Sequence, residues 1–176
     1  MEFEYAIVED EAQIGDGTRM WEFSKIDKTA IIGDDCVIGQ NCYIAGTLGN
    51  KTHIQNNVSV YAGIEIGDEC FIGNNVSFSN VNIPRVWRPI DPAQYKKTVI
   101  CHGVTIEPNA TIAPGVTIGR SAIIGHGSVV VEDVPPETMV NGNPAKVSLR
   151  SLNNKIKMHE EKRKKASQDF VRNSDV

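Results

Sequence analysis

Most side chains with distinctive chemistry in this sequence lie around one interruption of its pattern. Segment 79–99 carries a basic cluster, unusual in a chain of formal net charge −4: Arg85, Arg88, Lys96 and Lys97. Such groups bind phosphate, so the cluster is a candidate diphosphate site. His102 follows this segment and is the best candidate for a general base, because a neutral imidazole accepts a proton near pH 7. His53, just before Gln55-Asn56-Asn57, is a candidate substrate contact.

Several other chemistries have no support in the sequence. There is no Ser-His-Asp pattern, no phosphate-binding loop and no glycine fingerprint between a strand and a helix. A zinc site of the γ-carbonic anhydrase type needs three convergent histidines, two of them close in sequence. His53, His102 and His126 are 49 and 24 residues apart and offer no such pair. We therefore expect no metal.

A six-residue repeat must position the candidate residues. Medium-sized apolar residues recur at every sixth position from Ile14 to Ile44, from Ile54 to Phe78 and from Ile106 to Val130. Small or β-branched residues stand two positions earlier, Cys36, Cys42 and Cys70 among them. Six is neither a helical nor a simple strand period, so it indicates a repeat architecture. Three six-residue faces close a coil of about 18 residues, which predicts an all-β parallel β-helix filled with Ile and Val.

Two breaks in the repeat predict departures from regular coils. The spacing from Ile44 to Ile54 is ten, which predicts four extra residues within 45–51 and leaves Leu48 outside the inward positions. The spacing from Phe78 to Ile100 is 22, and the intervening prolines and charges predict a projecting loop over 79–99. Counting only the regular positions gives about five coils, to which the breaks add.

The pattern ends at Pro135, and the remainder has a different character. An apolar stripe of Leu149, Leu152 and Ile156 predicts a helix over about 148–169, followed by a frayed end. We therefore divide the chain into a β-helix domain, 1–147, and a C-terminal helix and tail, 148–176.

Composition limits the functional class. The pI of about 5.6 argues against a nucleic-acid binder. The acidic first residues contain no apolar run, so neither a membrane span nor an export signal is expected, which favours the cytoplasm. The cysteines at small positions of the repeat are expected to pack as reduced core residues.

The repeat, with glycine after many inward residues, resembles the hexapeptide-repeat acyltransferases over roughly residues 6–147. This resemblance implies a left-handed β-helix and a homotrimer with active sites between subunits. The run Ile112-Ala-Pro-Gly, Ile124-Gly-His-Gly and Asn141-Gly-Asn-Pro-Ala-Lys is similar to the acyl-CoA-binding end of that family. Acetyl-CoA is the implied co-substrate, and the implied contacts are Ala113, Gly115, Gly125, Gly127, Asn143, Pro144, Ala145 and Lys146.

A narrower resemblance concerns Ile54-Gln-Asn-Asn-Val-Ser-Val-Tyr-Ala-Gly and Asn74-Asn-Val-Ser-Phe-Ser-Asn-Val-Asn-Ile-Pro-Arg. These segments are similar to N-acetyltransferases that act on dTDP- or UDP-linked 3-amino-dideoxy sugars for surface polysaccharides. The resemblance places Asn80 opposite the sugar amine, with His102 as a second catalytic candidate. It makes substrate contacts of His53, Asn57, Tyr61, Asn82, Arg85 and Arg88. Main-chain N–H groups of Ala113–Gly115 are the candidate oxyanion donors.

Two alternatives stay open on the sequence. An O-acetyltransferase of the same superfamily would need a true base for its hydroxyl acceptor, which would make His102 indispensable. A non-catalytic β-helix scaffold or binding subunit belongs to a different class, and acetyl-CoA should then fail to raise its melting temperature.

Overall fold

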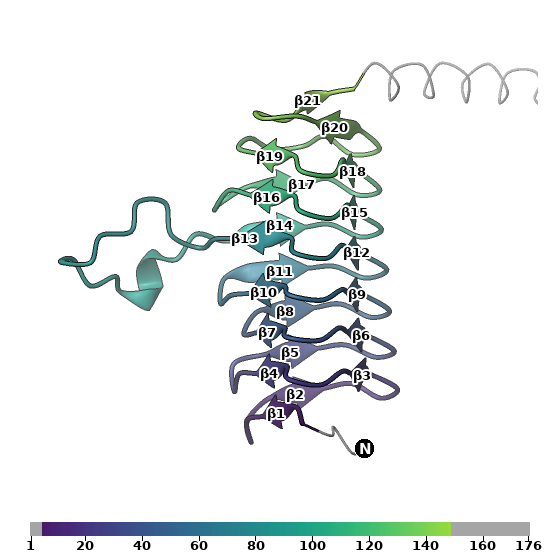
Figure 1. The fold of residues 1–176 in the computed structure, drawn as a ribbon, viewed down its shortest axis with the longest axis vertical. Helices are drawn as coiled ribbons and strands as arrows, with labels where there is room; N and C mark the ends of the chain where they lie inside the picture. Colours follow the sequence, from purple (N-terminus) through teal and green to yellow (C-terminus); the bar gives the residue numbers. More distant parts are fainter. Residues whose placement is uncertain (1–4, 149–176) are drawn as a thin grey trace, which may run out of the picture.

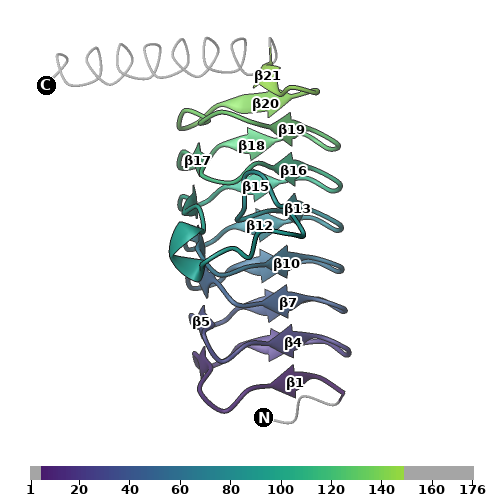
Figure 2. The same ribbon diagram turned by 90° about the vertical axis from the view of Figure 1, so that its left-hand side faces the viewer.

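The computed structural model describes residues 5–148, which form a three-sided column of stacked coils with about seven turns (Figures 1 and 2). The first face holds β1 (Ile7–Val8), β4 (Lys25–Ile26), β7 (Tyr43–Ile44), β10 (Ser59–Val60), β13 (Ser77–Phe78), β16 (Thr111–Ile112) and β19 (Val129–Val130). The second holds β2 (Gln13–Ile14), β5 (Ile31–Ile32), β8 (Thr47–Leu48), β11 (Ile64–Ile66), β14 (Thr98–Ile100) and β17 (Thr117–Ile118). The third holds β3 (Arg19–Met20), β6 (Val37–Ile38), β9 (His53–Ile54), β12 (Phe71–Ile72), β15 (Thr105–Ile106), β18 (Ile123–Ile124), β20 (Met139–Asn141) and β21 (Lys146–Val147).

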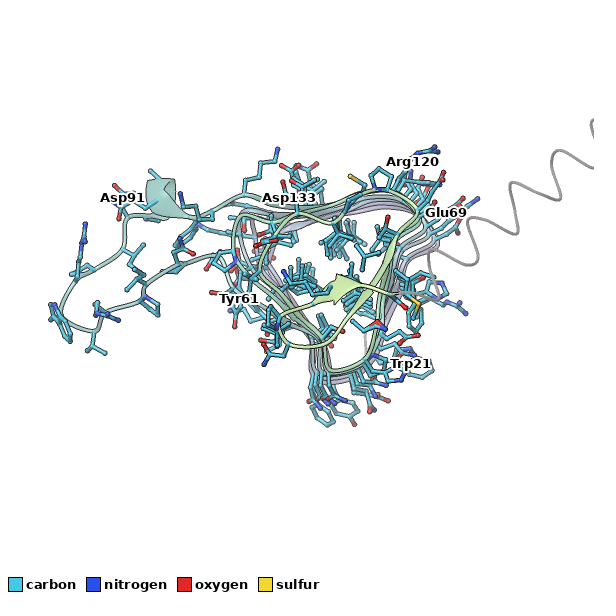
Figure 3. All side chains as sticks on the ribbon, turned by 90° about the horizontal axis from the view of Figure 1, so that it is seen from above. Trp21, Tyr61, Glu69, Asp91, Arg120 and Asp133 are labelled. Carbon is cyan, nitrogen blue, oxygen red and sulfur yellow. The ribbon has the colours of Figure 1, made fainter. Side chains whose placement is uncertain are left out.

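The column is a left-handed parallel β-helix, as predicted. All strand pairs between β1 and β20 are parallel, and within residues 5–148 only β20 and β21 pair antiparallel. Seen from the C-terminal end, successive corners pass clockwise through the positions of Tyr61, Glu69 and Trp21 as the chain rises toward the viewer (Figure 3). A chain that turns clockwise while approaching the viewer winds to the left.

The core consists of columns of branched aliphatic side chains, one per face. Ile38, Ile54, Ile72, Ile106 and Ile124 stack in register on the third face and are almost completely buried. The prediction for the cysteines at small positions is confirmed. Cys36, Cys42 and Cys70 are buried free thiols, and burial raises the pKa of Cys70 to about 11, which keeps it protonated.

The corners show why Asn, Asp and Gly recur in the sequence. On two of the three edges nearly every coil has a residue with positive φ, such as Asn57 at 61° and Glu69 at 54°. Side chains also bind the next coil: the carboxamide oxygen of Asn56 accepts from the Gln40 N–H at 3.0 Å, and that of Asn74 accepts from the Asn56 N–H at 3.1 Å. Turn residues therefore serve both the local bend and the stacking between coils.

The first break was interpreted wrongly. Leu48 lies inside the column, 1% exposed, and pairs with Ile32 and Ile66 on the second face. The corner after Ile44 is shorter by two residues, rather than longer by four, so inward positions fall at 44, 48 and 54. The corner after Val130 is shortened in the same way, and buried Val134 and Val140 carry the column beyond Pro135, where the pattern appeared to end.

The second break is a loop that leaves the column after Phe78 and returns at Thr98, where β14 begins, two residues before the predicted end (Figure 1). Its only helical element is the 3-10 turn η1 (Pro92–Gln94), where the Ala93 N–H donates to the Asp91 carboxylate at 2.9 Å. The predicted C-terminal helix lies, apart from Ser148, outside the described residues.

Candidate functional site

Three edges separate the faces: the loop edge, the asparagine edge and the acidic edge. The loop edge comprises 61–63, 79–80 with 96–97, 113–115 and 131–133. The asparagine edge comprises 21–23, 39–41, 55–57, 73–75, 107–109 and 125–127. The acidic edge comprises 34–35, 50–51, 68–69, 102–103 and 120–121. Figure 3 shows Tyr61, Trp21 and Glu69 at three different corners of the triangle, which mark the loop, asparagine and acidic edges respectively.

Asn80 is held in one orientation on the loop edge. Its side-chain Nδ2 donates to the Ala62 carbonyl in the coil below at 3.0 Å, and its own carbonyl accepts from the Lys96 N–H at 2.8 Å. The side chain is half-buried. Among residues 5–148 no group donates to its Oδ1, so a positioned acceptor is left over at the base of the loop.

The returning end of the loop is fixed between two glycines of this edge. Gly63 and Gly115 have φ of +88° and +86°. The Gly63 carbonyl accepts from the Thr98 N–H at 2.9 Å, and the Thr98 hydroxyl accepts from the Gly115 N–H at 2.9 Å. A Cβ on Gly63 would approach the Lys96 carbonyl to 3.2 Å, so the loop passes close to the column here.

The expected oxyanion donors in 113–115 are already used. The Ala113 N–H donates to Val130, the Gly115 N–H donates to Thr98, and Pro114 has no N–H. The expectation was therefore wrong. A different donor is present where the first face is interrupted, because its strands divide into two sheets between β10 and β13. Within residues 5–148, the Tyr61 N–H at this interruption has no acceptor.

An aromatic pair on the loop edge was missed in the sequence. The Tyr43 and Tyr61 rings lie one coil apart with centroids 6.0 Å from each other. The Tyr43 hydroxyl donates to Asp27 Oδ2 at 2.9 Å, and partial burial together with this carboxylate raises the pKa of Tyr43 to about 12. Because the corner after Ile44 is shortened, the coil here has 16 residues and Tyr43 pairs with Ser59, so the sequence spacing of 18 between the two tyrosines gave no signal of their contact.

The loop residues proposed for phosphate binding are separated. Arg85 and Arg88 lie at the exposed tip, where an isolated antiparallel β-bridge joins their backbones. The Arg85 guanidinium is 5.8 Å from the Trp87 ring centre. Asn82 is exposed on the same loop. Lys97, at the base, pairs with Glu65 at 2.8 Å. The four basic residues therefore do not form one compact site in this chain.

Other predicted residues lie away from the loop edge. Asn57 belongs to the asparagine edge, where its Oδ1 accepts from Asn41 and its Nδ2 donates to Asn75. Gly125 lies beneath the Asn141 side chain, and Gly127 faces open space. His53 points outward from β9 on the third face.

His102 is not brought near Asn80. It lies exposed on the acidic edge, with Nε2 3.8 Å from a Glu69 carboxylate oxygen. Within one chain, the two catalytic candidates therefore occupy different edges of the column.

The last residues predicted to bind CoA, 143–146, cover the top of the column. Asn143, Pro144 and Ala145 form the turn between β20 and β21, and the Ala145 N–H donates to Val129 at 2.8 Å. The Lys146 ammonium extends to within 4.0 Å of Glu132 on the loop edge. Ala113, Gly115 and Lys146 thus approach the same edge as Asn80.

No group of three or more His, Cys, Asp or Glu side chains in residues 5–148 is placed to hold a metal ion. Over the same residues, no helix has the length and apolar character needed to cross a bilayer.

Comparisons with known proteins agree with this geometry. The bacterial transferase hexapeptide model matches residues 47–80 and 97–132, and the model for the hexapeptide repeat of succinyl-transferase matches residues 29–62. No curated protein sequence matches the chain significantly.

Solved structures share the fold. PerB from Caulobacter crescentus, in complex with CoA and GDP-perosamine, is 22% identical with a TM-score of 0.50; the match covers 82% of this chain and 54% of PerB, so the chain spans about half of that protein. A hexapeptide-repeat acetyltransferase from Vibrio cholerae is 26% identical, with a TM-score of 0.50 and coverage of 77% and 72%. AntD, an N-acyltransferase from Bacillus cereus, is 16% identical, with a TM-score of 0.54 and coverage of 90% and 86%. The chain belongs to the bacterial hexapeptide-repeat transferases, the left-handed β-helix acyltransferase superfamily that its sequence resembles.

Proposed function

We propose that this protein is an acetyl-CoA-dependent N-acetyltransferase that acts on the amino group of a dTDP- or UDP-linked 3-amino-dideoxy sugar. We place the reaction in the cytoplasm, where it would supply surface polysaccharide synthesis, and in a homotrimer with active sites between subunits. The observation that carries the proposal is the carboxamide of Asn80, whose Nδ2 is bound to Ala62 and whose Oδ1 is left as an acceptor.

A site that has a hydrogen-bond acceptor but no strong base suits an amine substrate better than a hydroxyl substrate. A neutral sugar amine can donate one N–H to Asn80 Oδ1 while its lone pair attacks the thioester carbonyl. The N–C bond forms, the C–S bond breaks, and the amine proton leaves with the thiol, so the products are an amide and CoA. The Tyr61 N–H is our candidate donor to the developing oxyanion, in place of the occupied groups of 113–115.

Donor and acceptor subsites follow from the rest of the loop edge. Ala113 and Gly115 leave room for an extended pantetheine arm, and Lys146 offers a charge to a CoA phosphate. PerB was crystallised with CoA and GDP-perosamine, and AntD with dTDP and 3-hydroxybutyryl-CoA, so related columns bind both classes of molecule. The guanidinium groups of Arg85 and Arg88 would bind the diphosphate of the acceptor.

A screen of nucleotide-linked amino sugars with acetyl-CoA, followed by thiol release, tests the proposal. We expect rapid release with a 3-amino sugar and none with its 3-hydroxy counterpart. Release with the hydroxy sugar alone would support the O-acetyltransferase. No release with any acceptor, together with no effect of acetyl-CoA on the melting temperature, would support a non-catalytic scaffold.

His102→Ala separates amine from hydroxyl acceptors by a second route. Because His102 lies on the acidic edge, away from Asn80, we expect kcat to fall by less than about threefold, whereas loss of a true general base costs about 10²–10⁴-fold. Steady-state kinetics over pH 6–9 would measure this. A loss of more than about 100-fold would return His102 to the reaction and favour a hydroxyl acceptor.

A further inference from the structure

The tip of the projecting loop exposes large apolar side chains to solvent. Ile83, Val86 and Trp87 are all exposed, and Trp87 is 81% exposed. The loop spans 79–97, longer than an ordinary connection in a compact domain. Clustered apolar side chains at an exposed tip indicate a surface that another molecule covers.

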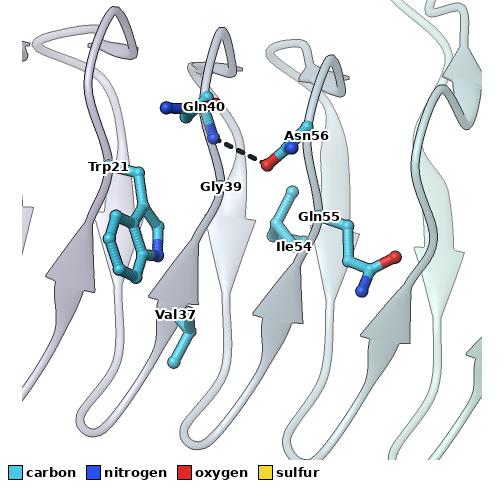
Figure 4. A pocket seen from close by; sticks show the side chains of 7 residues that line it. All are labelled: Trp21, Val37, Gly39, Gln40, Ile54, Gln55 and Asn56. Atoms are coloured by element: carbon cyan, nitrogen blue, oxygen red, sulfur yellow. Dashed lines mark hydrogen bonds between the residues drawn. The ribbon is translucent and has the colours of Figure 1, made fainter.

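A hollow on the column has the complementary character. It has a volume of about 400 Å³ and lies where the third face meets the asparagine edge. Its lining residues are Trp21, Val37, Gly39, Gln40, Ile54, Gln55 and Asn56, and none of them is charged (Figure 4). Trp21 is 56% exposed, and its indole ring lies beside the coil that carries Val37 and Gln40 (Figure 4).

The loop cannot fill the hollow of its own chain. Figure 3 shows the loop extending from the Tyr61 corner, whereas Trp21 lies at a different corner of the triangle. A loop of this length folded back on itself reaches about 30 Å at most, which suffices to contact an adjacent column. A projection on one surface and a hollow on another form a heterologous contact, which closes into a ring when the rotation permits.

Charge also favours this pairing. Arg85 and Arg88 flank Trp87 at the tip. Beside the hollow, Glu22 accepts from the Gln40 side chain at 2.8 Å, and this bond lowers the pKa of Glu22 and keeps it ionised. A basic tip would therefore meet a carboxylate at the rim of a neutral hollow.

We propose that the loop tip of each subunit inserts Trp87 into the Trp21 hollow of a second copy of this chain. This inference rests on the assembly part of the proposed function. It would place the neighbour's asparagine edge, with Asn57, beside the loop edge that carries Asn80 and Tyr61. Asn57 and Asn80, which one chain separates, would then meet between two chains.

Disulfide trapping tests the contact directly. In a Cys101→Ser background, where the remaining cysteines are buried, one chain carries Val86→Cys and a differently tagged chain carries Gln55→Cys. We expect mild oxidation of the mixture to give a covalent heterodimer that contains both tags. The matched control replaces Gln55→Cys by Arg120→Cys, an exposed position on the acidic edge, and should give at least tenfold less product. Equal or greater yield from the control would overturn the proposal.

Tryptophan fluorescence gives an independent readout, because Trp21 and Trp87 are the only tryptophans in the sequence. Trp21→Phe and Trp87→Phe variants each keep one indole. As the protein concentration rises and the chains assemble, the fluorescence emission of that indole should shift to shorter wavelength and become less quenched by acrylamide. A sedimenting oligomer in which Trp87 stays fully quenchable would overturn the contact. If Trp87 stays quenchable but acetyl transfer persists, the loop contact is wrong while the proposed reaction stands. If the disulfide-trapped dimer forms but no acetyl transfer occurs, the loop contact stands while the proposed reaction is wrong.

Discussion

Asn80→Ala should lower kcat/KM for the nucleotide amino sugar by about 100-fold, equivalent to about 2.7 kcal/mol of transition-state stabilisation. The substitution removes both the acceptor that would orient the amine and the 3.0 Å bond to Ala62 that holds it. The effect should fall mainly on kcat, because the nucleotide is bound elsewhere. Thiol release under saturating acetyl-CoA measures the change.

Asn82→Ala is the matched control for Asn80→Ala. This second asparagine lies on the same loop, exposed, and makes no hydrogen bond within residues 5–148. Its removal should change kcat by less than about twofold, and any diphosphate contact would appear in KM. If the two variants behave alike while both keep the wild-type melting temperature, Asn80 is not the amine acceptor.

Ile72→Ala should lower the free energy of unfolding by about 2–5 kcal/mol. Ile72 is completely buried and lies between Ile54 and Ile106 in the third-face column. Removing its side chain leaves a gap that neighbouring coils, tied by backbone bonds above and below, cannot close. Urea unfolding followed by circular dichroism measures the loss.

Ile31→Ala provides the comparison for Ile72→Ala. Ile31 has the same residue type and also lies in a two-residue strand, but it points outward and is 47% exposed. Its truncation should change the unfolding free energy by less than about 1 kcal/mol. Equal losses for the two variants would mean that strand propensity, rather than the filled column, stabilises the coils.

Much of the fold could be predicted because its cause is periodic. A buried position every six residues is visible in Ile14 to Ile44 without any knowledge of contacts, and it specifies faces, coils and core together. The shortened corners could not be read in this way. Leu48 breaks the spacing of six, and only its pairing with Ile32 and Ile66 shows that a corner can lose two residues without loss of stacking.

The site was less predictable because corners carry no period that distinguishes edges. Asn80 and His102 are close in sequence to the same loop, but one follows the first face and the other follows the second, so they emerge on different edges. Whether the Gly115 N–H is free depends on Thr98, which returns from the far end of the loop. Such contacts are set by where the loop re-enters the column, which the residue spacing does not specify.

Strand β21 makes the two ends of the column unlike. A stack of parallel coils presents an open ladder at its end, and such a ladder can recruit identical coils from another molecule. Here the chain reverses at 142–145 and lays β21 antiparallel on β20, so the register needed by an incoming parallel coil is no longer offered on that face. Any fibre built end to end would have to peel this strand away first, and lengthening the protein by design should therefore insert new coils below β20.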